Sequence, residues 1–170
     1  MSVVSNAGPL MALGKLNRLE LLVEVYGQVQ ITRAVYTEVV TQGLARGEPD
    51  ALVTRLFWQT QGWPIIDVPA DVLAAYQPPT ILGDGETEVL ALAQTLSNPL
   101  VLLDDELARA EARRLNLTVR GTLGVLVEAY HQQHLTYTQL DLLLQEIAAR
   151  PDIWISDELC QQILDSLPKP

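Results

Sequence analysis

Two aspartates that follow a short apolar run are the residues of this sequence best placed to do chemistry. The run Leu100 to Leu103 is typical of a strand buried on both faces, and it stops at Asp104-Asp105, where a helical pattern begins at once. Asp105 is predicted to cap that helix, whereas Asp104 is predicted to face inward. Because an inward carboxylate needs a partner, a divalent cation is the expected ligand.

Three further polar residues fall where predicted strands end or on apolar helix faces. Asn6 follows the first predicted strand, and Glu86 lies in the first turn of a helix, on the face that carries its apolar side chains. Glu38 shares a predicted helix face with Ala34 and Val35. An unpaired carboxylate on such a face is costly, so it is expected to have a partner. Glu86 and Asp104 begin adjacent elements of one α/β unit, and we expect them to meet above the sheet.

Each of these residues also has a plainer interpretation. The pair Asp104-Asp105 could simply cap a helix, which contributes about 0.5–2 kcal/mol. Glu86 could pair with an arginine, and Glu38 could be exposed on the surface of its helix. Asn6 is a good turn residue before Gly-Pro. What favours a site is the combination of these residues rather than any one of them.

Strands alternate with helices through the first three-quarters of the chain. This order predicts an α/β fold, a three-layer α/β/α sandwich around a mostly parallel sheet. Pro64 indicates that the third strand lies at an edge. Residues 1–150 are predicted to form this domain, and 151–170 a C-terminal helix packed on it.

The predicted strands are 2–5, 28–31, 63–68, 100–103 and 117–120. The predicted helices are 10–24 with a break at Gly14, 33–42 capped by Thr32 and ended by Gly43, 51–61, 71–76, 83–97, 104–115, 121–132, 137–149 and 156–167.

The composition and charge are typical of a soluble globular protein. With 170 residues, 48% hydrophobic and 19% charged, the chain is predicted to be one globular, soluble domain without a membrane span. The first residues lack a basic leader, so no signal peptide is expected. The single cysteine, Cys160, excludes an internal disulfide and suits the cytoplasm. A net charge of −10 argues against a broad, non-specific grip on nucleic acid.

Five separate motifs, in order along nearly the whole chain, resemble those of PIN-domain proteins. They are VVSNAGPL at 3–10, AVYTEV at 34–39, GDGETE at 83–88, LLDD at 102–105 and GTLGVL at 121–126. The resemblance is closest to a VapC-like branch that carries the GTLGVL segment and a closing WISDEL stretch, here 154–159. It implies a ribonuclease that depends on Mg²⁺ or Mn²⁺, acts on RNA, and is often the toxin of a toxin–antitoxin pair.

The same resemblance implies roles for individual residues. Asn6 takes the place of the first acidic ligand, Glu38 the second acidic position, Glu86 the third, and Asp104 the strand-end aspartate. Asp104, Glu86 and Asn6 are therefore the expected metal ligands. Asn6 departs from the family pattern, since an amide oxygen can coordinate Mg²⁺ but brings no charge.

Two more positions are expected to serve hydrolysis. Asp105 or Glu38 would orient the attacking water, and Thr122 would hydrogen-bond water or phosphate. Thr122 as a plain helix N-cap is the alternative for that residue.

Four of the eleven basic residues fall between positions 109 and 120 and could contact RNA phosphates. Ordinary ion pairs are the default expectation, at spacings such as Asp105 to Arg109 and Glu111 to Arg114. Glu88 is predicted to be solvated. The two histidines, at 131 and 134, are predicted to lie at a solvated helix end. The four basic residues between positions 109 and 120, named above as possible contacts to RNA phosphates, are Arg109, Arg113, Arg114 and Arg120.

Three functions are compatible with these features. The leading one is the metal-dependent ribonuclease, with an antitoxin protein as possible partner and a homodimer to whose interface the helix around Leu159 could contribute. The alternative is a catalytically degenerate PIN module that binds RNA or a partner protein, which Asn6 and the net charge of −10 favour. A phosphoacceptor receiver domain is set aside because it wants a lysine at a late strand end, and the only lysines are Lys15 and Lys169.

Overall fold

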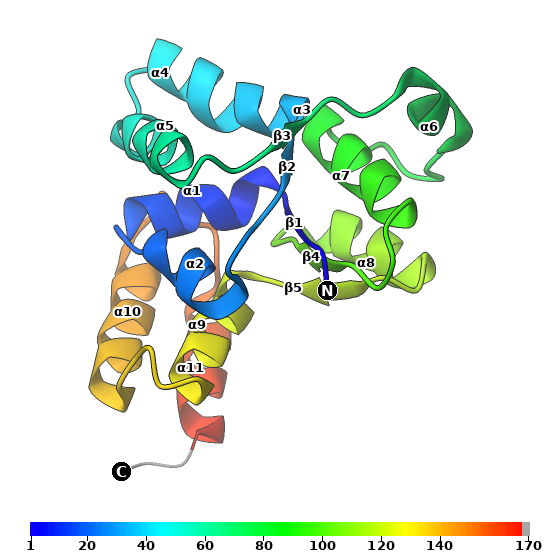
Figure 1. Cartoon of the computed structure of the whole chain (residues 1–170). Coiled ribbons are helices and arrows are strands. Elements are labelled where there is room, and N and C mark those ends of the chain that lie inside the picture. Colours follow the sequence, from blue (N-terminus) through cyan, green and yellow to red (C-terminus); the bar gives the residue numbers. More distant parts are fainter. Residues whose placement is uncertain (168–170) are drawn as a thin grey trace.

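Five short parallel strands form the centre of the molecule in the computed structural model, which describes residues 1–167 (Figure 1). The predicted C-terminal segment 151–170 ends in residues 168–170, which lie outside the described part of the chain. The strands are β1 (Val3–Ser5), β2 (Ile31–Thr32), β3 (Ile65–Ile66), β4 (Leu100–Leu102) and β5 (Thr118–Arg120).

The strands follow one another in the order β3–β2–β1–β4–β5. Val4 of β1 pairs with Val101 of β4, which in turn pairs with Val119 of β5. A parallel bridge between Val4 and Gln30 joins this ladder to the β2–β3 pair. β3 lies at an edge, as Pro64 predicted. Because every pairing is parallel, the carboxyl ends of the strands lie along the same edge of the sheet.

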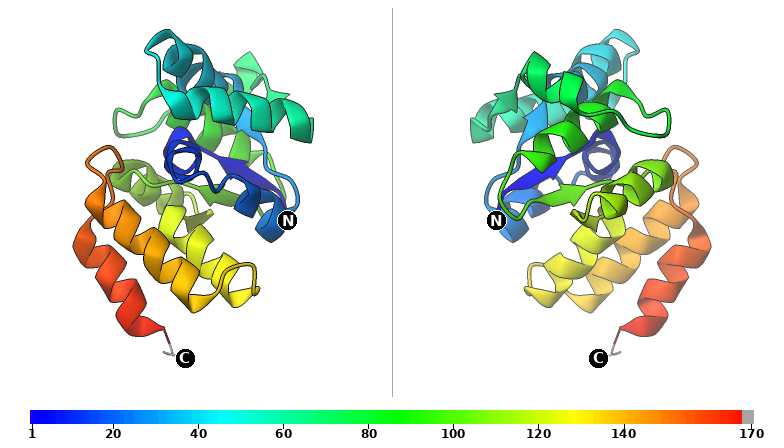
Figure 2. Two further views of the ribbon diagram at one scale, coloured as in Figure 1. Left: turned by 90° about the vertical axis from the view of Figure 1, so that its left-hand side faces the viewer. Right: turned by 90° about the vertical axis from the view of Figure 1, so that its right-hand side faces the viewer.

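Helices cover both faces of this sheet, which confirms the predicted three-layer α/β/α architecture. In Figure 2, α3, α5 and α7 lie on one side of the sheet, and α9, α10 and α11 lie on the other. The helical elements are α1 (Ala7–Lys15), α2 (Glu20–Tyr26), α3 (Arg33–Tyr36), the π-helical segment η1 (Thr37–Gln42), α4 (Gly43–Ala45), α5 (Pro49–Gln61), α6 (Ala70–Ala75), α7 (Asp84–Gln94), α8 (Glu106–Arg114), α9 (Thr122–His131), α10 (Tyr137–Ala149) and α11 (Asp157–Ser166).

One hydrophobic core joins the sheet to the helices of both layers. Its largest fully buried side chains come from the strands, from α1, α2, α7 and α9, and from the C-terminal α10. They are Leu10, Leu13, Leu21, Leu22, Ile31, Leu90, Leu100, Leu102, Leu103, Leu126, Leu140 and Leu144.

Two glycines that were predicted to end or break helices lie inside helical segments instead, so both predictions are wrong. Gly14 is within α1 because α5 packs closely there: a Cβ at Gly14 would lie 3.2 Å from Thr54 Oγ1 and 3.3 Å from Asp50 Cβ. At Gly43 a Cβ would lie 2.7 Å from Ala51 Cβ, and the backbone continues helically into α4. Tight helix packing, and not chain reversal, explains these two glycines.

The start of α3 is held by two side chains. Thr32 accepts a hydrogen bond from the Val35 N–H at 3.4 Å, which confirms its predicted capping role. Glu88 of α7 accepts from the Ala34 N–H at 2.9 Å, so the prediction of a solvated Glu88 is wrong. The partner is 54 residues away in the sequence, and the carboxylate satisfies one of the free N–H groups at the helix start.

The buried carboxylate of Glu111 ties α8 to the segment that follows α6. Glu111 and Arg114 pair at 2.7 Å as their spacing predicted, but Glu111 is buried, and the Tyr76 hydroxyl donates to it at 3.1 Å. The hydrogen bond from Arg114 holds the pKa of Glu111 below its usual value. Burial, and then the bond to Glu111, raise the pKa of Tyr76.

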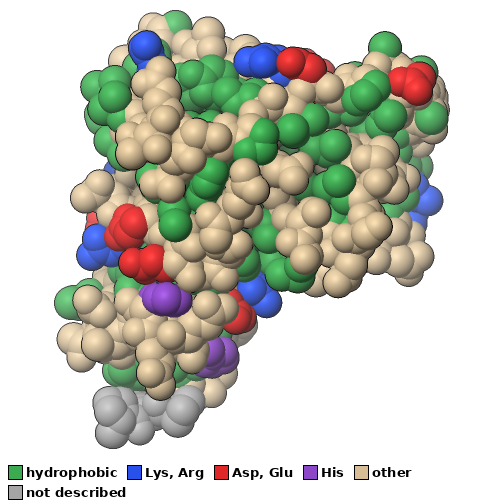
Figure 3. Space-filling model, in the orientation of Figure 1, with side chains coloured by type: hydrophobic (Ala, Val, Ile, Leu, Met, Phe, Trp, Pro, Cys, Tyr) green, Lys and Arg blue, Asp and Glu red, His purple; other side chains and the backbone are tan. Residues whose placement is uncertain are grey.

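The face shown in Figure 3 has its charged side chains scattered, with both histidines on its lower part. His131 and His134 are exposed at the end of α9, as predicted, and His134 Nδ1 lies 3.9 Å from Glu24 Oε2. Among residues 1–167, no helix combines the length and apolarity that crossing a bilayer requires.

Replacing Leu144 by Ala tests whether α10 belongs to the common core. Leu144 is 0% exposed, and we expect the free energy of unfolding to fall by about 2–5 kcal/mol, because the change leaves a cavity. Leu142, two residues away on the same helix, is 58% exposed, and Leu142→Ala should change stability by no more than about 0.5 kcal/mol. Urea unfolding of both variants measures the difference, and equal effects would contradict a core that includes α10.

Candidate functional site

A cavity of about 690 Å³ lies beside the carboxyl edge of the sheet. Its walls carry many oxygen-bearing side chains drawn from five separate parts of the chain. Five of the six predicted site residues line it, and the sixth, Thr122, contacts one of them. The polar and charged residues that line it are Asn6, Lys15, Glu38, Glu86, Asp104, Asp105, Glu106 and Asp152.

Asp104, just past the end of β4, is fixed by Thr122. The Thr122 backbone N–H donates to Asp104 Oδ1 at 2.7 Å, and the Thr122 hydroxyl donates to Oδ2 at 2.6 Å. Glycines make room for this carboxylate: a Cβ at Gly121 would lie 2.8 Å from Oδ1, and one at Gly8 would lie 3.3 Å from Oδ2. Burial raises the pKa of Asp104, while the bonds from Thr122 and the charge of Arg109 oppose that rise.

The neighbours of Asp104 take partly different roles from those predicted. Asp105 accepts from the Ala108 N–H at 2.9 Å, so its predicted capping of α8 is confirmed. The predicted ion pair between Asp105 and Arg109 is wrong, because Arg109 instead donates to the Leu103 carbonyl at 2.8 Å. The N-cap of α9 is Gly121, so the interpretation of Thr122 as that cap is also wrong.

Asn6 carries the clearest unmet hydrogen-bonding need in the cavity. Its backbone N–H donates to the Leu102 carbonyl at 2.9 Å, which fixes it beside β4. The side chain is only 6% exposed, and its Oδ1 has no hydrogen-bond partner within residues 1–167. A Cβ at Gly85 would lie 3.1 Å from this oxygen and 3.1 Å from Glu38 Oε2. Both oxygens therefore lie close to the backbone of Gly85, and the Asn6 oxygen is available to accept a bond from a ligand or to coordinate an ion.

Glu38 and Glu86 both line the cavity and form an acidic pair. Glu38 stands in η1, and a π-helical turn of this kind is frequent at functional sites. Glu86 Oε2 accepts from the Gly83 N–H at 2.8 Å at the start of α7. Burial raises the pKa of the Glu38 carboxyl, the charges of Glu86 and then Asp84 raise it further, and Arg46 opposes them. The two carboxylates thus lie close enough to repel each other.

Four helices begin at this group of carboxylates. Residues at the starts of α1, α7 and α8 line the cavity, and the first residue of α9 bonds Asp104. The amino end of a helix carries a partial positive charge and free N–H groups. These four ends therefore offset part of the negative charge that the carboxylates bring.

The donor chemistry fits a hard divalent cation. Carboxylate and amide oxygens are the ligands that Mg²⁺ prefers, and Mg²⁺ commonly keeps several waters and takes one or two carboxylates directly. Within residues 1–167, no three His, Cys, Asp or Glu side chains are close enough together to hold an ion by themselves. The residues thus fit a hydrated ion, for which Asp104, Glu86 and the free Asn6 oxygen are the candidate contacts.

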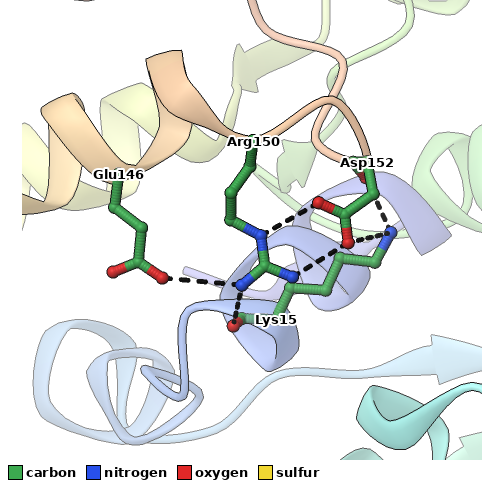
Figure 4. A network of polar contacts seen from close by, with 4 residues as sticks. All are labelled: Lys15, Glu146, Arg150 and Asp152. Atoms are coloured by element: carbon green, nitrogen blue, oxygen red, sulfur yellow. Dashed lines mark hydrogen bonds and ion pairs between the residues drawn. The ribbon is translucent and has the colours of Figure 1, made fainter.

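The sequence interpretation missed one whole wall of the cavity. Residues 152–155, between α10 and α11, line it together with Lys15 at the end of α1. Lys15 Nζ donates to the Asp152 carbonyl at 2.7 Å, and Arg150 bonds the Asp152 carboxylate at 2.9 and 2.8 Å and the Lys15 carbonyl at 3.0 Å (Figure 4). The one available signal was the WISDEL stretch, whose position in the sequence does not indicate contact with α1.

The basic side chains are mostly engaged away from the cavity. Arg114 pairs with Glu111, and Arg120 pairs with Glu128 at 3.3 Å and donates to the Tyr26 hydroxyl at 3.2 Å. Among the described residues, Lys15 is the only basic side chain that lines the cavity. The predicted contact between the four arginines and RNA phosphates stays a prediction.

Comparison with known proteins decides the family. A family model described as a PIN domain matches residues 2–169. The chain belongs to the PIN-domain family. PIN domains are commonly nucleases, so membership indicates nuclease-type chemistry on nucleic acid. Neither the curated proteins nor the solved structures gave a match.

In this PIN domain, Glu38→Gln should make stability less dependent on pH when metal is absent. Because the folded protein keeps the proton on Glu38 to a higher pH than the unfolded chain does, the free energy of unfolding falls as pH rises above the ordinary glutamate pKa. The variant should gain less than about 1 kcal/mol at pH 8, since Glu38 is only half-buried, and nothing near pH 3.

Guanidinium unfolding in EDTA at the two pH values measures this difference. Glu48→Gln, at an exposed position before α5, controls for the loss of one carboxylate. A Glu38→Gln variant that is less stable than the parent at pH 8 would show that the Glu38 charge is favourably paired.

Proposed function

We propose that this PIN domain is a Mg²⁺- or Mn²⁺-dependent endoribonuclease of the VapC-like branch. The observation that carries the proposal is the convergence of Asp104, Glu86, Glu38 and Asn6 on one cavity at the end of the sheet. Membership of the PIN-domain family supports nuclease chemistry at that place. RNA as the substrate class and the VapC-like branch rest on the motif resemblance.

In this proposal Asp104, Glu86 and Asn6 hold the cation, directly or through water. When bound, a divalent cation polarises the scissile phosphate and lowers the pKa of an attacking water. Of the two proposed bases, Glu38 is the better suited, because its raised pKa lies closer to neutral pH than the pKa of an ordinary glutamate. Asp105 uses one oxygen to cap α8, which leaves the other to orient water.

Thr122 acts through Asp104 in this scheme. Its hydroxyl hydrogen points to Asp104 Oδ2, so that hydrogen is not free for a phosphate oxygen while the bond lasts. The two bonds from Thr122 instead fix the orientation of the carboxylate, which makes Thr122 a positioning residue.

Asp104→Asn and Glu86→Gln should each reduce RNA cleavage by on the order of 100-fold or more, because each removes a charge on which the cation depends. Cleavage of a mixed single-stranded RNA with Mg²⁺ or Mn²⁺, and with EDTA as a blank, measures the effect. Asp141→Asn, at a half-buried position on α10 outside the cavity, is the control and should cleave like the parent. Cleavage that persists in EDTA or in Asp104→Asn would refute the assignment.

A catalytically degenerate PIN module is the second candidate. The observation that favours it is Asn6 itself, since an uncharged amide stands where the resemblance expects an acid. Such a module would keep the cavity and bind RNA or a partner protein without hydrolysis. A parent protein that binds RNA but cleaves none, beside an Asn6→Asp variant that does cleave, would support this candidate.

Asn6→Asp should also change how the protein responds to metal. The new carboxylate would face Glu38 across Gly85, so we expect a lower Tm in EDTA. Added Mg²⁺ should raise the Tm of the variant more than that of the parent, because a tenfold lower Kd adds about 1.4 kcal/mol at saturation. Asn98→Asp, in the exposed turn before β4, is the matched control. Equal Mg²⁺-induced shifts in Asn6→Asp and the parent would exclude Asn6 from the metal site.

The partners that we propose rest on the net charge of the chain and on the motif resemblance. The net charge of −10 favours a basic protein, as an antitoxin with a DNA-binding segment would be. The antitoxin, the homodimer and the cytoplasmic location stay predictions.

A further inference from the structure

Trp154 is the most conspicuous side chain that the proposed chemistry does not use. It lines the cavity yet is 95% exposed, whereas the chain's other two tryptophans, Trp58 and Trp63, are 2% and 8% exposed. Single exposed apolar residues are common on protein surfaces. An exposed indole that lines a cavity of carboxylates is a different situation, because it lies beside the place where a substrate would bind.

The loop that carries Trp154 is held firmly. Ile153, on one side of it, is buried, and the Ile155 N–H donates to the Ile153 carbonyl at 3.0 Å, which closes a tight turn with Trp154 at its tip. Arg150 and Lys15 fix Asp152, just before the turn, to the end of α1 (Figure 4). Figure 2 shows this loop, in orange, rising above α10 and α11 toward the sheet. The backbone that carries the indole is therefore held in place, so little loop ordering is needed on binding.

The charges around the cavity decide what this indole can contribute. Six carboxylates and one lysine line the cavity, so the protein has little positive charge with which to attract a phosphate backbone there. Proteins that hold single strands combine such charge with aromatic side chains on which bases stack. With the electrostatic part weak, a stacking contact would supply a large share of the affinity.

We propose that Trp154 is a stacking platform for one unpaired base of an RNA strand, next to the phosphodiester that enters the acidic cavity. This inference rests on the proposed function for its substrate class. Because every base has a flat face, stacking on Trp154 would favour single-stranded RNA over duplex without demanding a particular sequence.

The test uses a fluorescein-labelled single-stranded oligoribonucleotide with 2′-O-methyl groups throughout, with the full chain and Mg²⁺. Trp154→Ala should bind it about 5- to 150-fold more weakly than the parent, and Trp154→Phe should recover most of the loss. Leu56→Ala, which removes a 54% exposed side chain from α5, outside the cavity, should bind like the parent. With cleavable RNA, Trp154→Ala should raise KM and leave kcat nearly unchanged.

The outcomes separate this inference from the proposed function. A parent that cleaves no RNA, with weaker binding only in Trp154→Ala, would refute the nuclease and support the platform. Normal cleavage and unchanged binding in Trp154→Ala would refute the platform and leave the nuclease standing. A parent that does not bind the oligonucleotide, or a Trp154→Ala variant that loses binding only to a partner protein, would overturn the platform.

Discussion

Mutual repulsion among carboxylates at one edge of the sheet is the constraint on which the rest of this structure depends. Parallel strands bring the acidic residues together, because their carboxyl ends share an edge. The fold then opposes the repulsion with the amino ends of four helices and with hydrogen bonds such as those from Thr122 to Asp104. Burial raises the pKa values of Asp104 and Glu38, and the charges of Glu86 and Asp84 raise that of Glu38 further, so this compensation is incomplete. Incomplete compensation is what a site for a positive ligand requires, since the ligand supplies the remainder.

The second condition for this cavity is that the backbone comes very close to the polar side chains that line it. Gly8 and Gly121 lie against Asp104, and Gly85 lies against Asn6 and Glu38. A side chain at Gly121 would overlap the carboxylate, so the glycine is required for space and not for backbone conformation. The shape of the cavity therefore depends on these glycines, which have no side chain, as much as on the acidic side chains that line it.

Local patterns in the sequence were enough for most of the architecture. The apolar run before Asp104, the cap at Asp105 and the alternation of strands with helices predicted the sheet and the three layers. Asn6, Asp104 and Asp105 line one cavity because strand ends in parallel sheets converge by geometry, and Glu38 and Glu86 reach it from η1 and α7. That inference needs no knowledge of tertiary contacts.

What could not be predicted depends on contacts between distant segments. Gly14 and Gly43 look like helix ends in the sequence, and only the packing of α5 shows why they are glycines. Glu88 looks solvated until α3 is placed beside it. The wall formed by residues 152–155 has no local signal, because Arg150 and Lys15, which hold it, are 135 residues apart.

The bond between Arg150 and the Lys15 carbonyl determines when, during synthesis, the cavity can be enclosed. The α10–α11 loop is made later than α1, since Arg150 follows Lys15 by 135 residues, and the cavity has an open side until that loop is available. A nascent chain would hold its acidic residues in a shallow, unfinished hollow, and only the arrival of the α10–α11 loop would enclose them. The order of translation thus separates folding of the sheet from completion of the cavity.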